Sequence, residues 1–165
     1  MVERDFEARA RGLAERHLKS APDRPATTAR GVHHLALICS DADATMAFYQ
    51  DVLGWPLVEI MENRDYPGSA HFFFDIGHEN LLAFFDFPGL DQPPWMETLG
   101  SMQHVAISVS PDAFVDIRRR LEGAGVEFMG ANEEIPDSIY FAGPDGERIE
   151  VLSDPLREMG GTPIG

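Results

Sequence analysis

The chain has a single cysteine, Cys39, few basic residues and no long hydrophobic run. One cysteine cannot form an internal disulfide, and the residues just before Cys39 are apolar, so we expect a reducing interior. No segment approaches the roughly 20 apolar residues that cross a bilayer. The opening MVERDFEARARG is too charged for a signal peptide. We therefore expect a soluble, cytoplasmic protein that is not associated with a membrane.

Positive charge is scarce. The 13 Lys and Arg residues stand against 28 Asp and Glu, giving a formal net charge of −15. Such a chain repels nucleic acid, and the charge also disfavours a small polyanionic substrate such as a phosphonate, without excluding it. Hydrophobic residues make up 44% of the chain, which is enough for a real core. A small molecule is the expected partner.

The first 30 residues differ from the rest of the chain. Residues 3–19 contain no proline and many strong helix formers, which predicts a surface helix. Residues 20–31, SAPDRPATTARG, are typical of a linker. We expect segment 1–30 to be a helical extension that packs on the main domain or on another subunit.

An internal repeat begins after the linker. HLALICS at 34–40 matches HVAISVS at 104–110, at an offset of 70 residues. Each copy is followed by a helical segment and then by three predicted strands. These strands are expected at 57–62, 69–77 and 80–87 in the first half, and at 126–130, 137–143 and 147–153 in the second.

The pattern predicts an α+β fold made of two βαβββ modules. A single helix covers only one face of each small sheet, so we expect the twin module to cover the other face. Two curved sheets paired in this way form a cup-shaped, barrel-like mixed sheet lined by both first strands. The expected boundaries are 31–86 and 101–155 for the modules, 87–100 for a connector rich in Pro and Gly, and 156–165 for a C-terminal tail. The alternative is an accidental repeat in an ordinary α+β protein.

Two histidines occupy the same position of the repeat. His34 and His104 begin the two first strands, each followed two residues later by a small alanine on the same strand face. A lone histidine on an apolar strand is more often a hydrogen-bonded core residue. Two at equivalent positions of paired modules would converge, which favours a shared site.

Glu150 is the third candidate. It lies in the middle of the apolar strand ERIEVLS, where a carboxylate is costly to bury unless it is paired or bound to a cation. The alternatives are a solvated strand face or an ion pair with Arg148 or Arg157. Two imidazoles and one carboxylate suit Fe(II) or Mn, and also Zn or Ni, and leave coordination positions open.

Several other residues have both a structural and a functional interpretation. His71 begins an aromatic strand and could enter the cup as an acid–base group or as support for a ligand. His33 should point to the opposite face and pack in the core or against a helix. Six phenylalanines between residues 72 and 87 are mostly core, but alternation sends about half toward the cup. Such a lining favours an aromatic or apolar substrate. Trp95 and Met96 in the connector could close over the mouth.

The segment GVHHLALICSDADATMAFYQDVLGWPLVE resembles the opening module of the vicinal oxygen chelate superfamily, which includes glyoxalase I, bleomycin-binding proteins and extradiol dioxygenases. MQHVAISVSPDAFVDIRRRLEGAGVEF, with IYFAGPDGERIEVLSDP, resembles its closing module. The resemblance covers about residues 31–155. It implies that one divalent metal ion is bound by His34, His104 and Glu150, the positions that match the family's ligands.

The resemblance also bears on the branch of the family. Members with four ligands place one in the last strand of the first module, where this chain has Leu82 or Ala83. A three-ligand site fits better, as in the dioxygenase and fosfomycin-resistance branches. IYFAGPDGERIE matches most of the extradiol signature, with Tyr140 in the place of its supporting tyrosine, but it has Gly143 at a position where larger residues are usual. The acid–base histidine expected before Tyr140 is absent.

We therefore expect a metal-dependent, dioxygenase-like enzyme for a small aromatic or apolar oxygenated substrate, with His71 and Tyr140 as catalytic candidates. Two alternatives stay open: a lyase, isomerase or transferase that uses the ion as a Lewis acid, and a protein that sequesters drugs or metabolites. Family members pair their modules within one chain or between two chains. We expect a homodimer.

Overall fold

The computed structural model describes residues 6–158, which fall into two compact units divided after Arg30. The first unit contains α1 (Phe6–His17) and a 3-10 turn, η1 (Ala21–Asp23). The helix expected over 3–19 is therefore present, although residues 3–5 lie outside the described residues. Within residues 6–158, no helix is long and apolar enough to cross a membrane.

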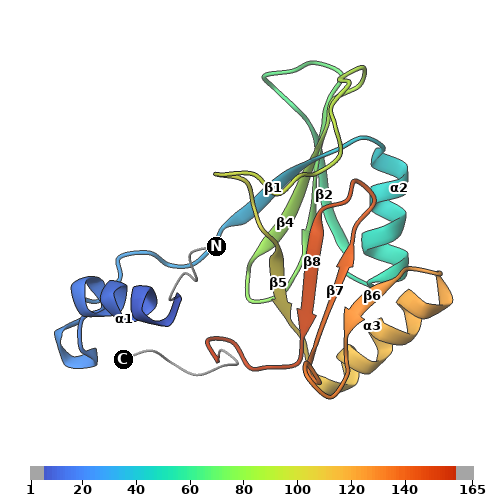
Figure 1. The fold of residues 1–165 in the computed structure, drawn as a ribbon. Coiled ribbons are helices and arrows are strands. Elements are labelled where there is room, and N and C mark those ends of the chain that lie inside the picture. The colour runs from blue at the N-terminus through green and yellow to red at the C-terminus, as the bar shows by residue number, and fades with distance from the viewer. Residues whose placement is uncertain (1–5, 159–165) are drawn as a thin grey trace, which may run out of the picture. The chain divides into compact units, whose positions relative to one another are not determined.

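The second unit, Gly31–Glu158, contains the repeat as two consecutive modules (Figure 1). Module 1 comprises β1 (His34–Cys39), α2 (Ala42–Ala47), the π-helical turn η2 (Phe48–Val52), β2 (Leu57–Glu62), β3 (Ala70–Asp75) and β4 (Leu81–Asp86). Module 2 comprises β5 (Val105–Ser108), α3 (Pro111–Gly123), β6 (Phe128–Gly130), β7 (Ser138–Ala142) and β8 (Arg148–Leu152).

Each module forms one four-stranded mixed sheet with the same topology. The strand orders are β1-β4-β3-β2 and β5-β8-β7-β6. In both sheets the first strand pairs in parallel with the last, and the remaining pairs are antiparallel. The predicted α+β fold with two βαβββ modules is confirmed.

Local signals explain where the module helices begin. The side chain of Asp41 accepts a hydrogen bond from the Ala44 backbone N–H at 2.9 Å and caps α2. Ser110 caps α3 and precedes Pro111 at the first helical position, a cap that we did not predict. The π-helical turn after α2 was also not predicted, and β6 starts at Phe128, two residues later than expected.

One hydrophobic core joins the two modules. The ring of Tyr49, from η2, lies 5.3 Å from that of Phe74 and 4.9 Å from that of Phe84. Phe48 on the same turn lies 6.2 Å from Phe141 of module 2. The buried residues of α3 belong to this same cluster. Each sheet therefore turns one face toward the helices and the shared core.

We call the opposite face of each sheet its open face. In β1 the open-face side chains of His34, Ala36 and Ile38 are exposed, whereas Cys39 on the other face is buried. The two sheets are separate in the described residues. One chain therefore does not bury its first strands in a common cup, because its modules pack through their helix-covered faces.

Candidate metal centre

The open face of the second sheet gathers three of the five predicted site residues. His104 immediately precedes β5, Tyr140 lies on β7 and Glu150 lies on β8. The register places Tyr140 directly opposite Glu150. Because side chains alternate along strands, all three project from the same face of the sheet.

Glu150 is held by contacts to both of its oxygens. The hydroxyls of Ser138 and Tyr140 each donate to Oε1 at 2.5 Å, and Oε2 lies 3.0 Å from Nε2 of His104. The Glu150 residue is only 8% exposed. Buried carboxylates are costly without such partners, so this side chain is fixed in one orientation. The alternative pairing with Arg148 is not seen, because Arg148 contacts Glu97 instead.

The separation between His104 and Glu150 fits two ligands of one ion. Nitrogen and oxygen donors at right angles, each roughly 2.1 Å from a metal, are about 3.0 Å apart. Nδ1 of His104 also faces Oε1 of Gln103. If Nδ1 donates its proton there, a neutral ring has no proton left on Nε2 for Glu150, and a cation between the two atoms would satisfy both.

Tyr140 supports the carboxylate as a protonated phenol. Its hydrogen bond to Glu150 and its partial burial both raise its pKa above the ordinary value. The phenol therefore stays a donor at neutral pH and orients Glu150.

The open face of the first sheet carries the remaining two predicted residues. His34 is exposed, and its ring lies 6.1 Å from that of His71 and 5.8 Å from that of Phe73. Nδ1 of His34 lies 2.9 Å from Nδ1 of His33. This contact leaves Nε2 of His34 as the nitrogen available to an ion. The prediction that His33 packs in the core is wrong, since it is exposed.

His71 is enclosed by aromatic rings. It stacks on Phe85 with 3.7 Å between ring centroids and lies 4.2 Å from Phe73. Its Nε2 is buried and has no hydrogen-bond partner among the described residues. Burial, followed by the neighbouring His34, lowers the pKa of His71, so the ring is neutral near pH 7.

The structure thus forms two partial sites. Within residues 6–158, no group of three or more His, Cys, Asp or Glu side chains is placed to hold a metal ion. His104 and Glu150 are together, and His34 is on the other module. Cys39 is no substitute, because burial raises the pKa of its thiol to about 11 and keeps it neutral.

Two supporting residues were missed in the sequence. Ser138 precedes Tyr140 by two residues, so strand alternation alone would have placed it beside Glu150. No comparable signal identifies Gln103. It precedes β5, and its contact with His104 depends on the side-chain rotamers of the two residues, which the sequence pattern does not specify.

The fold and register define a protein of two repeated βαβββ modules. The sequence profile of the Glyoxalase/Bleomycin resistance protein/Dioxygenase superfamily matches residues 31–151. The chain belongs to this superfamily.

Its relatives are named for different reactions. It is 26% identical over 139 residues to the "Putative ring-cleaving dioxygenase MhqA" of Bacillus subtilis (strain 168), covering 81% of this chain and 43% of that protein. It is 25% identical over 122 residues to the glutathione transferase FosA of Serratia marcescens, covering 74% of this chain and 79% of that protein. The chain thus spans less than half the length of MhqA.

A solved structure shows the same fold. A point mutant of the fosfomycin resistance protein FosX from Listeria monocytogenes, complexed with Mn(II) and 1S,2S-dihydroxypropylphosphonic acid, superposes with a TM-score of 0.59 at 20% identity. The match covers 78% of this chain and 96% of that one. Family homologues therefore bind a divalent metal.

Proposed function

We propose that the protein is a metal-dependent, dioxygenase-like enzyme whose single ion is held by His34, His104 and Glu150. The observation that carries this is the fixed pair of His104 and Glu150, with donor atoms 3.0 Å apart on an open sheet face. Bound there, a divalent ion supplies Lewis-acid polarisation of paired substrate oxygens, and Fe(II) also supplies redox chemistry with oxygen.

We further propose that the third ligand comes from a second copy of the chain. His34 is exposed on the open face of module 1. The two modules of one chain contact each other on the side away from the open faces. There, the Tyr49 hydroxyl donates to Oε1 of Glu147 at 2.6 Å, and the Ser40 N–H donates to Oδ2 of Asp145 at 3.0 Å. Pairing the open face of module 1 with that of module 2 from another chain would complete the triad and bury both faces. This arrangement makes the protein a homodimer.

The chain's own residues have distinct roles in this proposal. Ser138 and Tyr140 hold Glu150 in position. His71 is the acid–base group of this proposal, because its Nε2 has no partner among the described residues. That nitrogen is buried, and Phe85 stacks on the ring, so the ring must turn before Nε2 can accept a proton from the substrate. The aromatic surroundings of His71 favour a small aromatic or apolar oxygenated substrate.

A transferase or other Lewis-acid enzyme is the second candidate. It is favoured by the resemblance to the glutathione transferase FosA from Serratia marcescens, to which the chain is 25% identical over 122 residues. The missing acid–base histidine near Tyr140 also favours it.

A mixed-dimer experiment tests the site. The variants His34→Ala and Glu150→Gln should each lose bound metal, because each removes a ligand from every site. Co-expressed with different tags and purified as the mixed dimer, they should regain half the wild-type metal content, since one site then receives both native ligands. Metal analysis of each species gives the answer. A mixed dimer without metal, beside a wild type that binds it, would show that the triad is not shared between chains.

The reaction type needs a separate measurement. The protein is loaded anaerobically with Fe(II), mixed with catechols and gentisate-like acids, and oxygen uptake is followed. Uptake that disappears in His71→Asn, at unchanged metal content, supports the dioxygenase. Stoichiometric metal without uptake across the panel supports the Lewis-acid candidate.

A further inference from the structure

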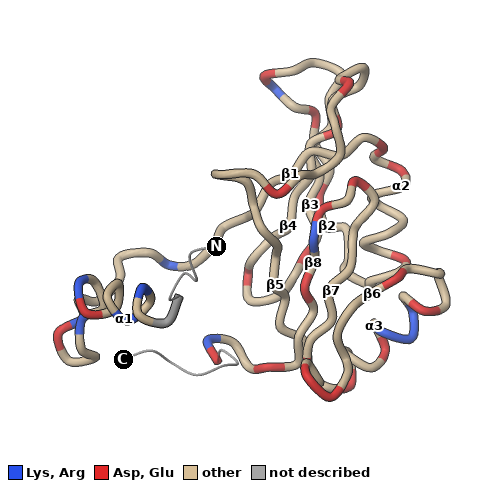
Figure 2. The backbone as a smooth tube through the Cα atoms, in the orientation of Figure 1, with Lys and Arg blue, Asp and Glu red and all other residues tan. Residues whose placement is uncertain are grey.

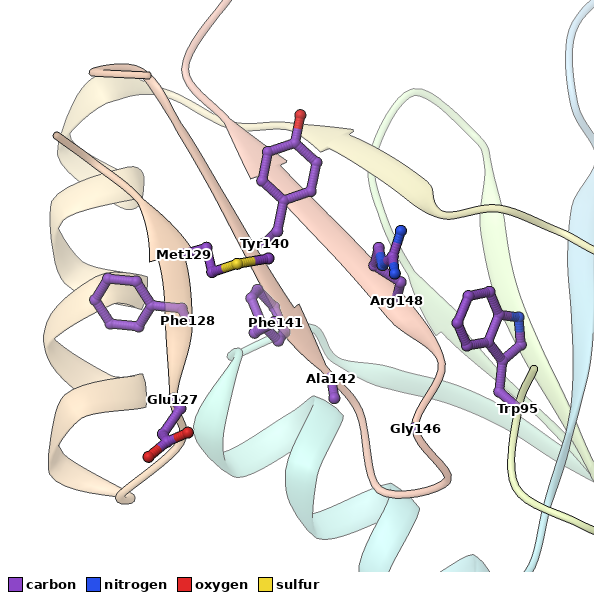
Figure 3. Close-up of a pocket in the computed structure, with 9 residues that line it drawn as sticks. All are labelled: Trp95, Glu127, Phe128, Met129, Tyr140, Phe141, Ala142, Gly146 and Arg148. Carbon is purple, nitrogen blue, oxygen red and sulfur yellow. The ribbon is translucent and has the colours of Figure 1, made fainter. Parts of the chain in front are cut away.

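A cavity of about 430 Å³ lies on the second sheet, lined by residues of β6, β7 and β8 and by Trp95 of the connector (Figure 3). Tyr140, which donates to Glu150, forms part of its wall. Trp95, Met129 and the small Ala142 give it a largely apolar lining. A ligand in this cavity would therefore be adjacent to the proposed metal ligands.

Arg148 is the only basic residue in the lining. It is on β8 two residues before Glu150, so both side chains leave the same face of the strand. Figure 3 shows Arg148 between Tyr140 and Trp95, with Glu127 at the far end of the cavity. Residues 31–158 contain only six of the 13 basic residues of the chain, and three of those six are in α3. In Figure 2, Asp and Glu are spread over both modules. A positive charge in this cavity is thus unusual for the molecule.

The guanidinium of Arg148 is held against Trp95, but most of its hydrogen-bond donors are not used by the protein. It lies 5.4 Å from the centroid of the Trp95 ring. Trp95 is itself anchored, because its indole N–H donates to the Met102 carbonyl at 3.0 Å and its backbone N–H to the Asp145 carbonyl at 2.9 Å. The contact of Arg148 with Glu97 is long, at 3.5 Å, and the Glu97 side chain is 56% exposed. A guanidinium has five N–H donors, so most remain available to a ligand.

We infer that Arg148 and Trp95 form an anion subsite and that the substrate is a monocyclic aromatic, or similarly small apolar, molecule carrying a carboxylate. That this ligand is the substrate rests on the proposed function. Two residues along a strand span roughly 6.6 Å, which is about the length of one aromatic ring with its substituent. A carboxylate at Arg148 would therefore leave the opposite end of the ring near Glu150.

The charge of the cavity favours a carboxylate over a phosphonate. A planar guanidinium pairs with a planar carboxylate through two parallel hydrogen bonds. Arg148 supplies a single positive charge, and the carboxylates of Glu97, Glu127 and Glu150 repel a dianion more strongly than a monoanion. The apolar lining suits a ring better than a small polar chain.

The test compares ligands that share a phenyl ring and differ in its polar substituent, which is a carboxylate, a neutral alcohol or a phosphonate. Metal-free protein is titrated calorimetrically with benzoate, benzyl alcohol and phenylphosphonate. Wild type should bind benzoate at least about tenfold more tightly than benzyl alcohol, because one charge-assisted hydrogen bond typically changes the affinity by about that factor. Arg148→Gln should remove the preference. Arg119→Gln, at an exposed site on α3 paired with Asp116, makes the same change in net charge and should keep it.

Arg148→Lys is the second variant, for use if Arg148→Gln does not fold by circular dichroism. It keeps the charge without the planar fork and should weaken benzoate binding several-fold while leaving benzyl alcohol unchanged. The subsite is overturned if wild type shows no preference for benzoate, with or without Mn(II), or if neither Arg148 variant alters it. Tighter binding of phenylphosphonate than of benzoate would overturn the carboxylate assignment.

Repeating the titration with Mn(II)-loaded protein separates this inference from the proposed function. With the metal in place, 3,4-dihydroxybenzoate should bind more tightly than catechol, and only Arg148 variants should lose the difference. A protein that binds no metal but still prefers benzoate would retain the anion subsite and refute the metal site.

Discussion

The two modules share one register but place different chemistry on it. The strand positions that hold Glu150 and Tyr140 in module 2 are held by Ala83 and Phe73 in module 1. This explains why module 1 offers no fourth ligand: Ala83 occupies the open-face position, and Leu82 is buried in the core. Equivalent backbone positions therefore do not make the two modules equivalent as sites.

The same register places His71 of module 1 where module 2 has Ser138. Ser138 donates to Glu150, whereas Nε2 of His71 has no partner among the described residues. Module 2 thus stabilises the Glu150 carboxylate by hydrogen bonds. Module 1 contributes the exposed imidazole of His34 and the aromatic rings around His71. A site shared between the two open faces would combine these properties.

The sharpest test of this difference removes the hydroxyls around Glu150. Tyr140→Phe and Ser138→Ala should each lower metal affinity by about 10- to 100-fold, because groups that orient a ligand typically contribute that much. The matched change in module 1, His71→Asn, should leave metal affinity nearly unchanged. Chelator competition measures all three variants. Equal losses in both modules would contradict the distinction drawn between them.

The repeat in the sequence was sufficient to predict the fold. The matched first strands and the alternation in the later ones predicted the strands of both modules, with strand ends correct to within about two residues, because these signals are local. Period-two alternation accounts for the placement of His104, Tyr140 and Glu150 on one face, although Tyr140 became a candidate only through the resemblance to the family.

What the sequence could not give was the packing of one module on the other. That packing depends on the π-helical turn η2, which turns Tyr49 into the core toward Glu147. Gly143, which departs from the extradiol pattern, is explained by the same contact, because any side chain there would collide with the Glu147 carboxylate. Such a long-range contact leaves no periodic signal.

The junction between the modules can be weakened selectively. Tyr49 is fully buried, and Tyr49→Phe removes its hydrogen bond to Glu147. We expect a loss of about 1–3 kcal/mol in the free energy of unfolding, the typical cost of leaving a buried acceptor unpaired. Urea denaturation measures it. Tyr66→Phe, at a residue 46% exposed, is the control and should change stability by less than about 0.5 kcal/mol. Similar losses in both variants would mean that the hydroxyl of Tyr49 contributes little to the junction.

The smallest expected effect is a pH dependence at the same junction. Burial raises the pKa of Glu147, despite the hydrogen bonds from Tyr49 and from the Asp145 backbone N–H that lower it. The folded protein therefore binds this proton more tightly than the unfolded chain does. By linkage, Glu147 makes folding more favourable as pH falls through its folded pKa, and this contribution is lost as pH rises.

The variant Glu147→Gln removes this pH-dependent contribution. The other acidic groups titrate in both proteins and cancel in the difference. The stability of wild type relative to Glu147→Gln, measured by urea unfolding over a series of pH values upward from the ordinary carboxyl pKa of 4.5, should decrease as the pH rises. A flat difference, or one that increases with pH, would show that burial does not raise the pKa of Glu147.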